Sequence, residues 1–345
     1  MSKIKISVIH SGYVKALGKY NPGNPDFCEA AFNEYIDLNI EKICDFVEQA
    51  GQVKSDIVCT HEDFTNAGML VRNFDHPGLF ESAVARSCKI IRARMSELAK
   101  QFNMLIAANN METIEGLVYN VSTLYGRDGG VIGQYRKVHL ADSENWKVTP
   151  GNTFDVFKTD IGNIGFYICY DSIFPEAARS LSLNGAEILI HQTQGWSCIG
   201  GGIDQDVGEA FQRIRAVENS VYLIVAKNMQ GGGSDGGRSM VVDNYGCIVA
   251  ESSKSEEGLL TVEIEPDFKM HDPYHHNNFF AGVPYCKARH NLARKPWLYG
   301  TLTDSNPKVL SEFPDCELHY SAADGEKAMA EWDKKPEEEK SKFHW

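Results

Sequence analysis

The chain lacks any long apolar run that could anchor it in a membrane. Its longest apolar stretches, such as Val221 to Ala226, are far shorter than the ~20 residues that a membrane-spanning helix needs. The segment from Met1 to Ile9 also lacks the apolar core of a secretion signal. We therefore expect no membrane partner and a cytoplasmic location.

The chain also has few basic residues relative to acidic ones. Thirty-four Lys and Arg residues stand against 47 Asp and Glu residues, which gives a formal net charge of −13. No dense basic stripe interrupts this balance, so a phosphate backbone would bind against an unfavourable field. Nucleic acid is thus excluded as the expected partner, which leaves small molecules and other proteins.

A disulfide framework is absent from the cysteine pattern. The nine cysteines form an odd set without a CxxC pair, which suits a reducing compartment. Most are expected to be small buried hydrophobic residues, so only the surrounding chemistry singles one out. They are Cys28, Cys44, Cys59, Cys88, Cys169, Cys198, Cys247, Cys286 and Cys316.

The hydrophobic pattern predicts an α/β protein with two sheets covered by helices. Hydrophobic residues make up 43% of the 345 residues, which is ample for a buried core in one large domain. Helical spacing of apolar residues alternates along the chain with short β-rich runs. The predicted strands are 5–10, 56–60, 104–108, 117–124, 131–135, 154–157, 164–168, 187–191, 221–226, 239–243, 247–250 and 259–264, and the predicted helices lie around 36–47, 81–99, 174–183 and 207–218.

The pattern fades after Pro266, which suggests three parts of the chain. Residues 1–265 are expected to form the folded domain. Residues 266–323 are expected to form an irregular arm that packs on this domain or on a partner subunit. Residues 324–345 are rich in Glu and Lys and read as a charged tail, a composition that buries itself poorly.

Reactive residue types follow three of the predicted strands. The segment 60–64 (THEDF) follows one strand, 135–140 (YRKVHL) follows a hairpin, and 168–176 (ICYDSIFPE) lies at a strand-to-helix corner. Because strand ends in α/β proteins converge on clefts, we expect Glu62, Lys137 and Cys169 to meet there.

These segments, together with 209–219, resemble the carbon–nitrogen hydrolase family, also called the nitrilase superfamily. The ordered set of motifs extends from about Ile4 to Ile264. The resemblance implies a four-layer α-β-β-α sandwich, no metal or organic cofactor, and a homodimer or larger homo-oligomer. It implies catalytic roles for Glu62, Lys137 and Cys169, and an assisting role for Glu144 in the segment 143–146 (SENW).

The chemistry of amide cleavage supports the same roles. A free thiol has a pKa of ~8.5 and is mostly protonated at neutral pH, so it needs a nearby base or cation. Glu62 can act as this base and Lys137 as the cation. As Cys169 attacks, Lys137 and the Tyr170 backbone N–H can stabilise the charge on the carbonyl oxygen. Water then attacks the thioester with the help of Glu62.

Three further residues are assigned to the substrate side. Tyr170 is expected to contribute its backbone N–H, and Tyr119 belongs to the Tyr119-Asn120 motif that supports the resemblance. For Trp196, lining the pocket and merely packing are equally supported. Arg215 and Glu218 are expected to pair within a helix rather than to contact substrate.

The sequence departs from the family pattern at the first motif and after the cysteine. His61 stands where proline usually precedes the glutamate, and it could shift Glu62 or tune it electrostatically. Tyr170-Asp171 is similar to the amidase and carbamoylase branches, whereas nitrilases commonly carry Trp-Glu there. Ser172 and Ile173 offer no arginine for an acidic substrate, so an ω-amide of a dicarboxylic acid is less supported.

The expected function is therefore hydrolysis of a small linear amide or N-carbamoyl compound. A nitrilase and a non-catalytic small-molecule-binding relative remain as alternatives. The segment 271–276 (HDPYHH) fits no standard metal-ligand spacing and is read as a loop. Residues 231–237 are rich in glycine but lack the ending of a phosphate-binding loop, so they are read as a mobile turn.

Overall fold

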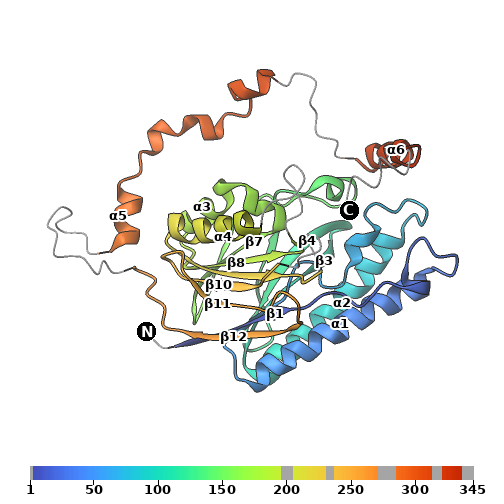
Figure 1. Ribbon diagram of the computed structural model, residues 1–345, viewed down its shortest axis with the longest axis horizontal. Helices are drawn as coiled ribbons and strands as arrows, with labels where there is room; N and C mark the ends of the chain where they lie inside the picture. Colours follow the sequence, from blue (N-terminus) through green and yellow to red (C-terminus); the bar gives the residue numbers. More distant parts are fainter. Residues whose placement is uncertain (1–2, 196–204, 231–236, 271–284, 313–320, 336–345) are drawn as a thin grey trace.

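Two six-stranded sheets lie face to face in the computed structural model, with helices on both outer faces (Figure 1). The structure describes residues 3–195, 205–230, 237–270, 285–312 and 321–335. The first sheet contains, in spatial order, β12 (Gly258–Ile264), β1 (Ile4–His10), β2 (Ile57–Cys59), β3 (Leu105–Ile114), β4 (Leu117–Tyr125) and β5 (Val131–Arg136). The second contains β11 (Ile248–Glu251), β10 (Met240–Val242), β9 (Tyr222–Lys227), β8 (Ile188–Thr193), β7 (Gly162–Ile168) and β6 (Val156–Thr159).

Both sheets share one pattern of strand directions. Strands β1, β2 and β3 are parallel in the first sheet, as are β7, β8 and β9 in the second. Antiparallel strands flank each parallel set. The carboxyl ends of the parallel strands therefore gather at one edge of each sheet, which is where α/β proteins place ligands.

The space between the sheets is filled by alternate side chains of the central strands. Ile6, Val8 and Ile57 from the first sheet pack with Ile168 and Ile190 from the second, and all five are fully buried. Alternation along each strand sends the intervening side chains to the outer faces. Each sheet consequently has one face toward its partner and one toward helices.

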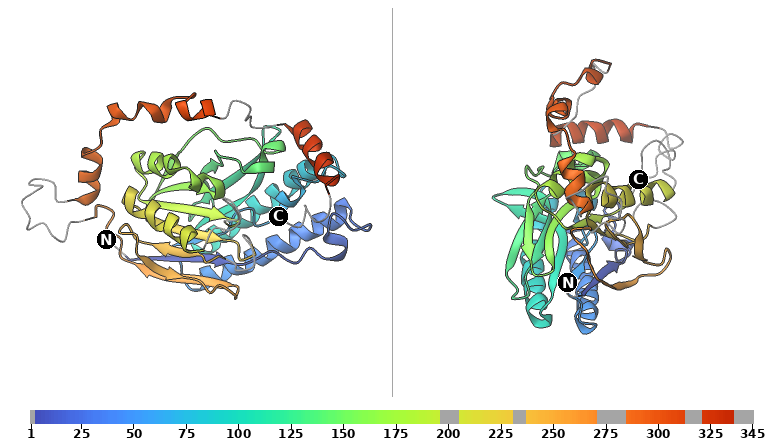
Figure 2. Two further views of the ribbon diagram at one scale, coloured as in Figure 1. Left: turned by 45° about the horizontal axis from the view of Figure 1, so that its top comes forward. Right: turned by 90° about the vertical axis from the view of Figure 1, so that its left-hand side faces the viewer.

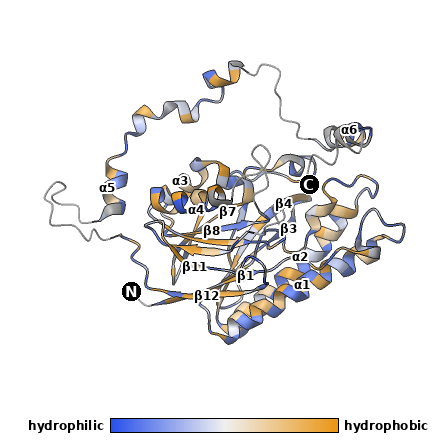
Figure 3. Cartoon of the chain, in the orientation of Figure 1, coloured by the Kyte–Doolittle hydropathy of each residue, from blue (hydrophilic) through white to orange (hydrophobic). Residues whose placement is uncertain are grey.

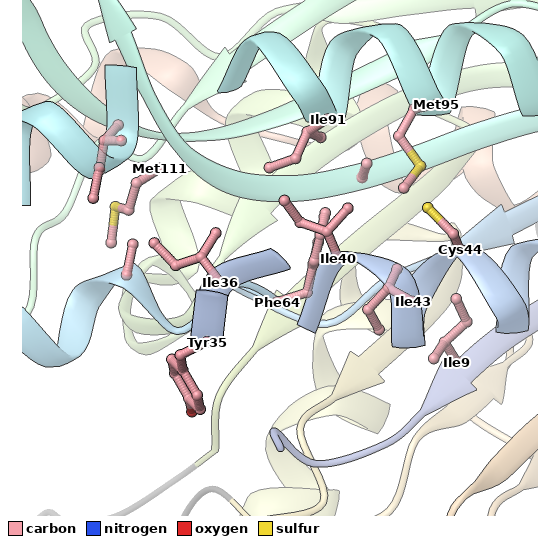
Figure 4. Close-up of a cluster of buried hydrophobic side chains, with 14 of the residues drawn as sticks. Ile9, Tyr35, Ile36, Ile40, Ile43, Cys44, Phe64, Ile91, Met95 and Met111 are labelled. Carbon is pink, nitrogen blue, oxygen red and sulfur yellow. The ribbon is translucent and has the colours of Figure 1, made fainter. Parts of the chain in front are cut away.

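Helices α1 (Glu29–Gln52) and α2 (Leu79–Phe102) cover the outer face of the first sheet. Figure 4 shows Ile36, Ile40 and Ile43 of α1 in the same buried cluster as Ile91 and Met95 of α2, in line with the predicted helical spacing. Helices α3 (Pro175–Leu183) and α4 (Gln205–Asn219) cover the second sheet. The predicted four-layer α-β-β-α sandwich is thus confirmed.

The segment after β12 leaves the sandwich and returns to it (Figures 1 and 2). It contains α5 (Cys286–Leu292), short 3₁₀ helices and α6 (Ala322–Asp333). A Cβ atom at Gly325 of α6 would lie 2.5 Å from the Trp146 ring and 2.8 Å from Phe74. Part of the segment predicted as a charged tail therefore forms a helix seated on the domain.

Strand β3 is longer than predicted. It continues to Ile114, although Asn109, Asn110 and Glu112 interrupt the apolar text. These polar residues are fully buried, and Asn109 Nδ2 donates a hydrogen bond of 3.0 Å to Asn120 Oδ1 on β4. The sequence pattern predicts too early an end because the polar residues that continue the strand have hydrogen-bond partners on another strand.

Hydropathy follows the layers of the sandwich. In Figure 3 the strands between the helical layers are largely coloured as hydrophobic, whereas α1 carries both colours. Within the described part of the chain, no helix combines the length and the apolar character needed to cross a membrane.

Candidate active site

Glu62 lies just beyond the end of β2 and is held by three donors. Its side chain is buried, and Oε1 accepts hydrogen bonds from Lys137 Nζ at 2.8 Å and from Asn120 Nδ2 at 2.9 Å. Its Oε2 accepts the backbone N–H of Gln194 at 2.9 Å. The carboxylate is therefore fixed between the two sheets. Asn120 lies in the first sheet and Lys137 directly follows β5 of that sheet, whereas Gln194 directly follows β8 of the second sheet.

Lys137 follows β5 and forms two ion pairs while being almost fully buried. Its Nζ lies 2.8 Å from Glu62 Oε1 and 2.6 Å from Glu144 Oε2. Burial by itself would lower the pKa of this ammonium, but the charges of Glu144 and Glu62 outweigh burial and raise the pKa well above its usual value. Lys137 is consequently a fixed cation at neutral pH.

Glu144 lies on a 3₁₀ helix, η3 (Asp142–Trp146), that packs beside the lysine. Its Oε2 also accepts the backbone N–H of Ala141 at 2.8 Å, and its Oε1 accepts Asn120 Nδ2 at 3.1 Å. The Asn120 amide thereby bridges the two carboxylates that flank Lys137. The structure brings Glu62, Lys137 and Glu144 into one charged cluster.

Cys169 opens the short 3₁₀ helix η4 (Cys169–Ile173), which connects β7 to α3. Its backbone has a φ of +43°, a left-handed conformation that non-glycine residues adopt rarely and mainly at functional sites. Burial and the charge of Glu62 raise the pKa of the thiol to about 12, although Lys137 and a hydrogen bond from Thr193 act in the opposite direction. The thiol lies close enough to the cluster to feel both charges, and it is protonated at neutral pH.

Asp171 anchors the turn that carries Cys169. Its buried carboxylate accepts the backbone N–H of Ile168 at 2.9 Å, the Tyr135 hydroxyl at 2.7 Å, and both the backbone N–H and Nδ1 of His139 at 2.8 Å. These donors come from β5, β7 and the segment after Lys137. Asp171 therefore ties the lysine segment to the cysteine turn.

Replacing Asp171 by Asn is expected to loosen this turn. An amide N–H₂ would face donors that need an acceptor, so we expect a loss of about 2–3 kcal/mol in the free energy of unfolding. Tyr135→Phe removes one of the donors and should cost only about 1 kcal/mol. Urea unfolding of both variants measures the difference, and equal costs would contradict the clamp.

Gln192 connects the two sheets beneath the cluster. Its Nε2 donates to the backbone oxygens of Thr60 at 2.8 Å and Ala107 at 3.1 Å, and its Oε1 accepts the Ser122 hydroxyl at 2.5 Å. Gln192, Thr193 and Asn120 position the site, yet sequence reasoning gave them no role. The signal available for Gln192 and Thr193 was a pair of polar residues at the end of the otherwise apolar β8, whereas Asn120 lies within β4.

Of the three predicted substrate-binding residues, Tyr170 and Tyr119 lie among the described residues. Tyr170 is 39% exposed beside Cys169 and contacts Phe174 edge to face. Tyr119 is 9% exposed, and the Arg136 guanidinium lies 4.6 Å from the centre of its ring. Alternation on β4 places Tyr119 and Asn120 on opposite faces, so the Tyr119 side chain is not part of the cluster. Trp196 lies outside the described residues.

His61, which replaces the expected proline, is buried behind Glu62. Its Nδ1 lies 3.0 Å from the Glu62 backbone oxygen. Burial lowers the pKa of His61 to about 4, so the ring is neutral at pH 7 and supplies no positive charge to Glu62. The histidine packs against the base rather than tuning it by charge.

The predicted pair of Arg215 and Glu218 on α4 is confirmed, with a distance of 2.9 Å between Nη1 and Oε1. Arg215 also donates to the Ser172 backbone oxygen at 3.3 Å. The pair thus supports the turn behind Cys169.

Metal-binding geometry does not occur in the part of the chain that the structure describes, because no three His, Cys, Asp or Glu side chains gather there as ligands. The segment 271–276 and residues 231–236 of the glycine-rich turn lie outside the described residues.

Comparison with known proteins points to one family. A family model described as Carbon-nitrogen hydrolase matches residues 31–268. Omega-amidase NIT2 of Xenopus tropicalis is 28% identical over 247 residues, which cover 67% of this chain and 84% of the relative. Omega-amidase NIT3 of Saccharomyces cerevisiae is 31% identical over 210 residues, which cover 56% of this chain and 68% of the relative.

Solved structures share the fold. A carbon-nitrogen hydrolase from Helicobacter pylori G27 superposes with a TM-score of 0.63 at 24% identity, covering 88% of this chain and 95% of that chain. A double mutant of the amidase from Nesterenkonia sp. AN1, in complex with acrylamide, gives a TM-score of 0.64 at 18% identity, covering 87% and 97%.

Proposed function

This chain belongs to the carbon–nitrogen hydrolase family, and from that premise we propose that it hydrolyses the C–N bond of a small amide or N-carbamoyl compound with Cys169 as nucleophile. The observation that carries the proposal is the buried cluster in which Lys137 contacts Glu62 and Glu144 while their charges act on the Cys169 thiol. The names of the omega-amidase relatives support an amide substrate.

The first half of the reaction forms a thioester. Because burial raises the pKa of Cys169 to about 12, the thiol needs a base at the moment of attack, and Glu62 takes its proton. The sulfur bonds to the carbonyl carbon, and the oxygen receives the π electrons. Lys137 and the Tyr170 backbone N–H stabilise this oxyanion. The C–N bond then breaks, and Glu62 returns the proton to the leaving nitrogen.

The second half hydrolyses the thioester. Water attacks the acyl carbon while Glu62 accepts one of its protons. The C–S bond breaks, the thiolate takes the proton back from Glu62, and the acid leaves. Glu144 holds Lys137 in place through the contact of 2.6 Å between its Oε2 and Lys137 Nζ. The ammonium is thereby flanked by the carboxylates of Glu62 and Glu144. The reaction needs no other reactant than substrate and water.

An ammonia-release screen tests the proposal. Purified protein is incubated with primary amides, ureido acids and nitriles, and ammonia and carboxylic acid are both quantified. From amides we expect equal amounts of ammonia and carboxylic acid. From ureido acids, whose attacked carbonyl carries two nitrogens, we expect equal amounts of ammonia, carbon dioxide and the free amine, and these are measured alongside. Products from nitriles alone would favour a nitrilase, and no product from any class would favour a non-catalytic binding protein.

We further propose that the protein is a cytoplasmic homodimer or larger homo-oligomer. Several large apolar side chains are exposed on the arm, which suits contact with a second subunit. They are Leu292, Trp297, Leu298 and Leu302.

The proposed cytoplasmic location is supported by the cysteines. The free thiols of the described cysteines suit a reducing compartment.

A further inference from the structure

Lys227 ends strand β9 at the level of the nucleophile. It pairs in register with Thr193 at the end of β8, and Ile168, which precedes Cys169, pairs with Gln192 on the same strand. Neighbouring strands are about 4.8 Å apart, so the backbones of Lys227 and Cys169 are separated by roughly 10 Å. Both residues therefore lie at the same edge of the second sheet.

The backbone of Lys227 is fixed, and its side chain is partly buried. Ser239 Oγ accepts the Lys227 N–H at 3.0 Å and lies 3.4 Å from its carbonyl oxygen. A Cβ atom at Gly237 would lie 1.6 Å from Lys227 Nζ, so the ammonium rests directly against the glycine backbone. The neighbouring His10 is neutral at pH 7, since burial lowers its pKa.

This ammonium has no counter-ion among the described residues. No carboxylate there lies within ion-pair distance of it, whereas Lys137 has two. Burial lowers the pKa of Lys227 to about 8, and among the described residues the nearby Cys169 acts in the opposite direction. A partly buried cation that no described carboxylate pairs with is costly for a folded protein unless another molecule supplies the negative charge.

We propose that Lys227 binds a carboxylate of the substrate and so determines specificity for amides or ureido compounds that carry a negative charge at the far end of a short chain. This inference rests on the proposed hydrolase function. Lys227 supplies the positive charge for an acidic substrate that Ser172 and Ile173, after Asp171, do not supply. A lysine side chain together with a linear substrate of a few carbon atoms is long enough to bridge the roughly 10 Å between the two backbones.

The test compares two matched substrate series on the wild type, Lys227→Met and Lys227→Arg. One series consists of monoamides of unbranched dicarboxylic acids, and the other consists of primary amides of equal length that end in a methyl group. We expect Lys227→Met to lower kcat/KM for the anionic series by about 10- to 100-fold, mainly through KM, and to leave the neutral series within about twofold. Lys227→Arg should restore part of the loss.

The outcomes separate this inference from the proposed function. An equal loss in both series would mean that Lys227 acts on the thiol rather than on the substrate and would overturn the inference. A wild type that hydrolyses neutral amides at least as efficiently as anionic ones would also overturn it, while the hydrolase function would stand. If the wild type releases no ammonia from either series or in the wider screen, the proposed function fails and the inference fails with it.

Discussion

Cys169→Ala is expected to abolish amide hydrolysis while the chain remains folded. The substitution removes the sulfur atom that we propose forms the thioester and leaves Glu62 and Lys137 in contact with each other. Loss of a nucleophile from such a unit typically lowers kcat by about four orders of magnitude or more. Ammonia release under saturating substrate measures the effect, and circular dichroism during thermal unfolding measures the fold.

A second cysteine provides the matched control. Cys247 is a free, exposed thiol that lies between β10 and β11. Cys247→Ala should leave kcat unchanged, because its thiol is not part of the cluster. Residual hydrolysis above a tenth of the wild-type rate in Cys169→Ala would mean that another group forms the covalent bond or that none is formed.

Lys137→Met is expected to affect both activity and stability. The substitution leaves the carboxylates of Glu62 and Glu144 buried without their shared cation, and breaking a buried ion pair in this way typically costs about 3–5 kcal/mol. The oxyanion also loses its charged donor, which lowers kcat by about 10²- to 10³-fold. Urea unfolding and ammonia release measure the two effects separately.

A double variant and an exposed lysine sharpen this prediction. Adding Glu144→Gln to Lys137→Met removes one unpaired charge and should restore part of the stability without restoring activity. Lys100→Met, in the last turn of α2, replaces an exposed lysine and should change neither quantity by much. Full stability in Lys137→Met would contradict the buried charged cluster.

The layers of the fold could be predicted from hydrophobic periodicity. Ile36, Ile40 and Ile43 mark one face of α1, and that face packs against α2 and the first sheet. Short apolar runs located nearly every strand, because buried parallel strands carry few polar residues. The prediction ended strand β3 at Ala108, because Asn109 and Glu112 are polar and form their hydrogen bonds with residues of another strand.

Part of the site could be predicted for a different reason. Glu62, Lys137 and Cys169 are reactive residue types at strand ends, and the ordered motifs place them in a known family. The contacts that Asn120 and Gln192 make depend on how two strands or two sheets are aligned, and a single chain does not contain that information. Lys227 was overlooked for the same reason, because its neighbour Thr193 is 34 positions away and is brought beside it by strand pairing.

We infer that an acyl-enzyme forms through the joint action of Glu62, Lys137 and Cys169, and mass spectrometry of a trapped intermediate is the sharpest test of this inference. In the wild type, a substrate that has an activated leaving group should form the thioester faster than water cleaves it, so acid quenching within the first turnovers should trap the acyl group on sulfur. The intact mass should increase by the acyl group, and peptide mapping should place it on Cys169. An unmodified Cys169 in protein quenched while it releases ammonia, or an acyl group on another residue, would contradict the acyl-enzyme mechanism.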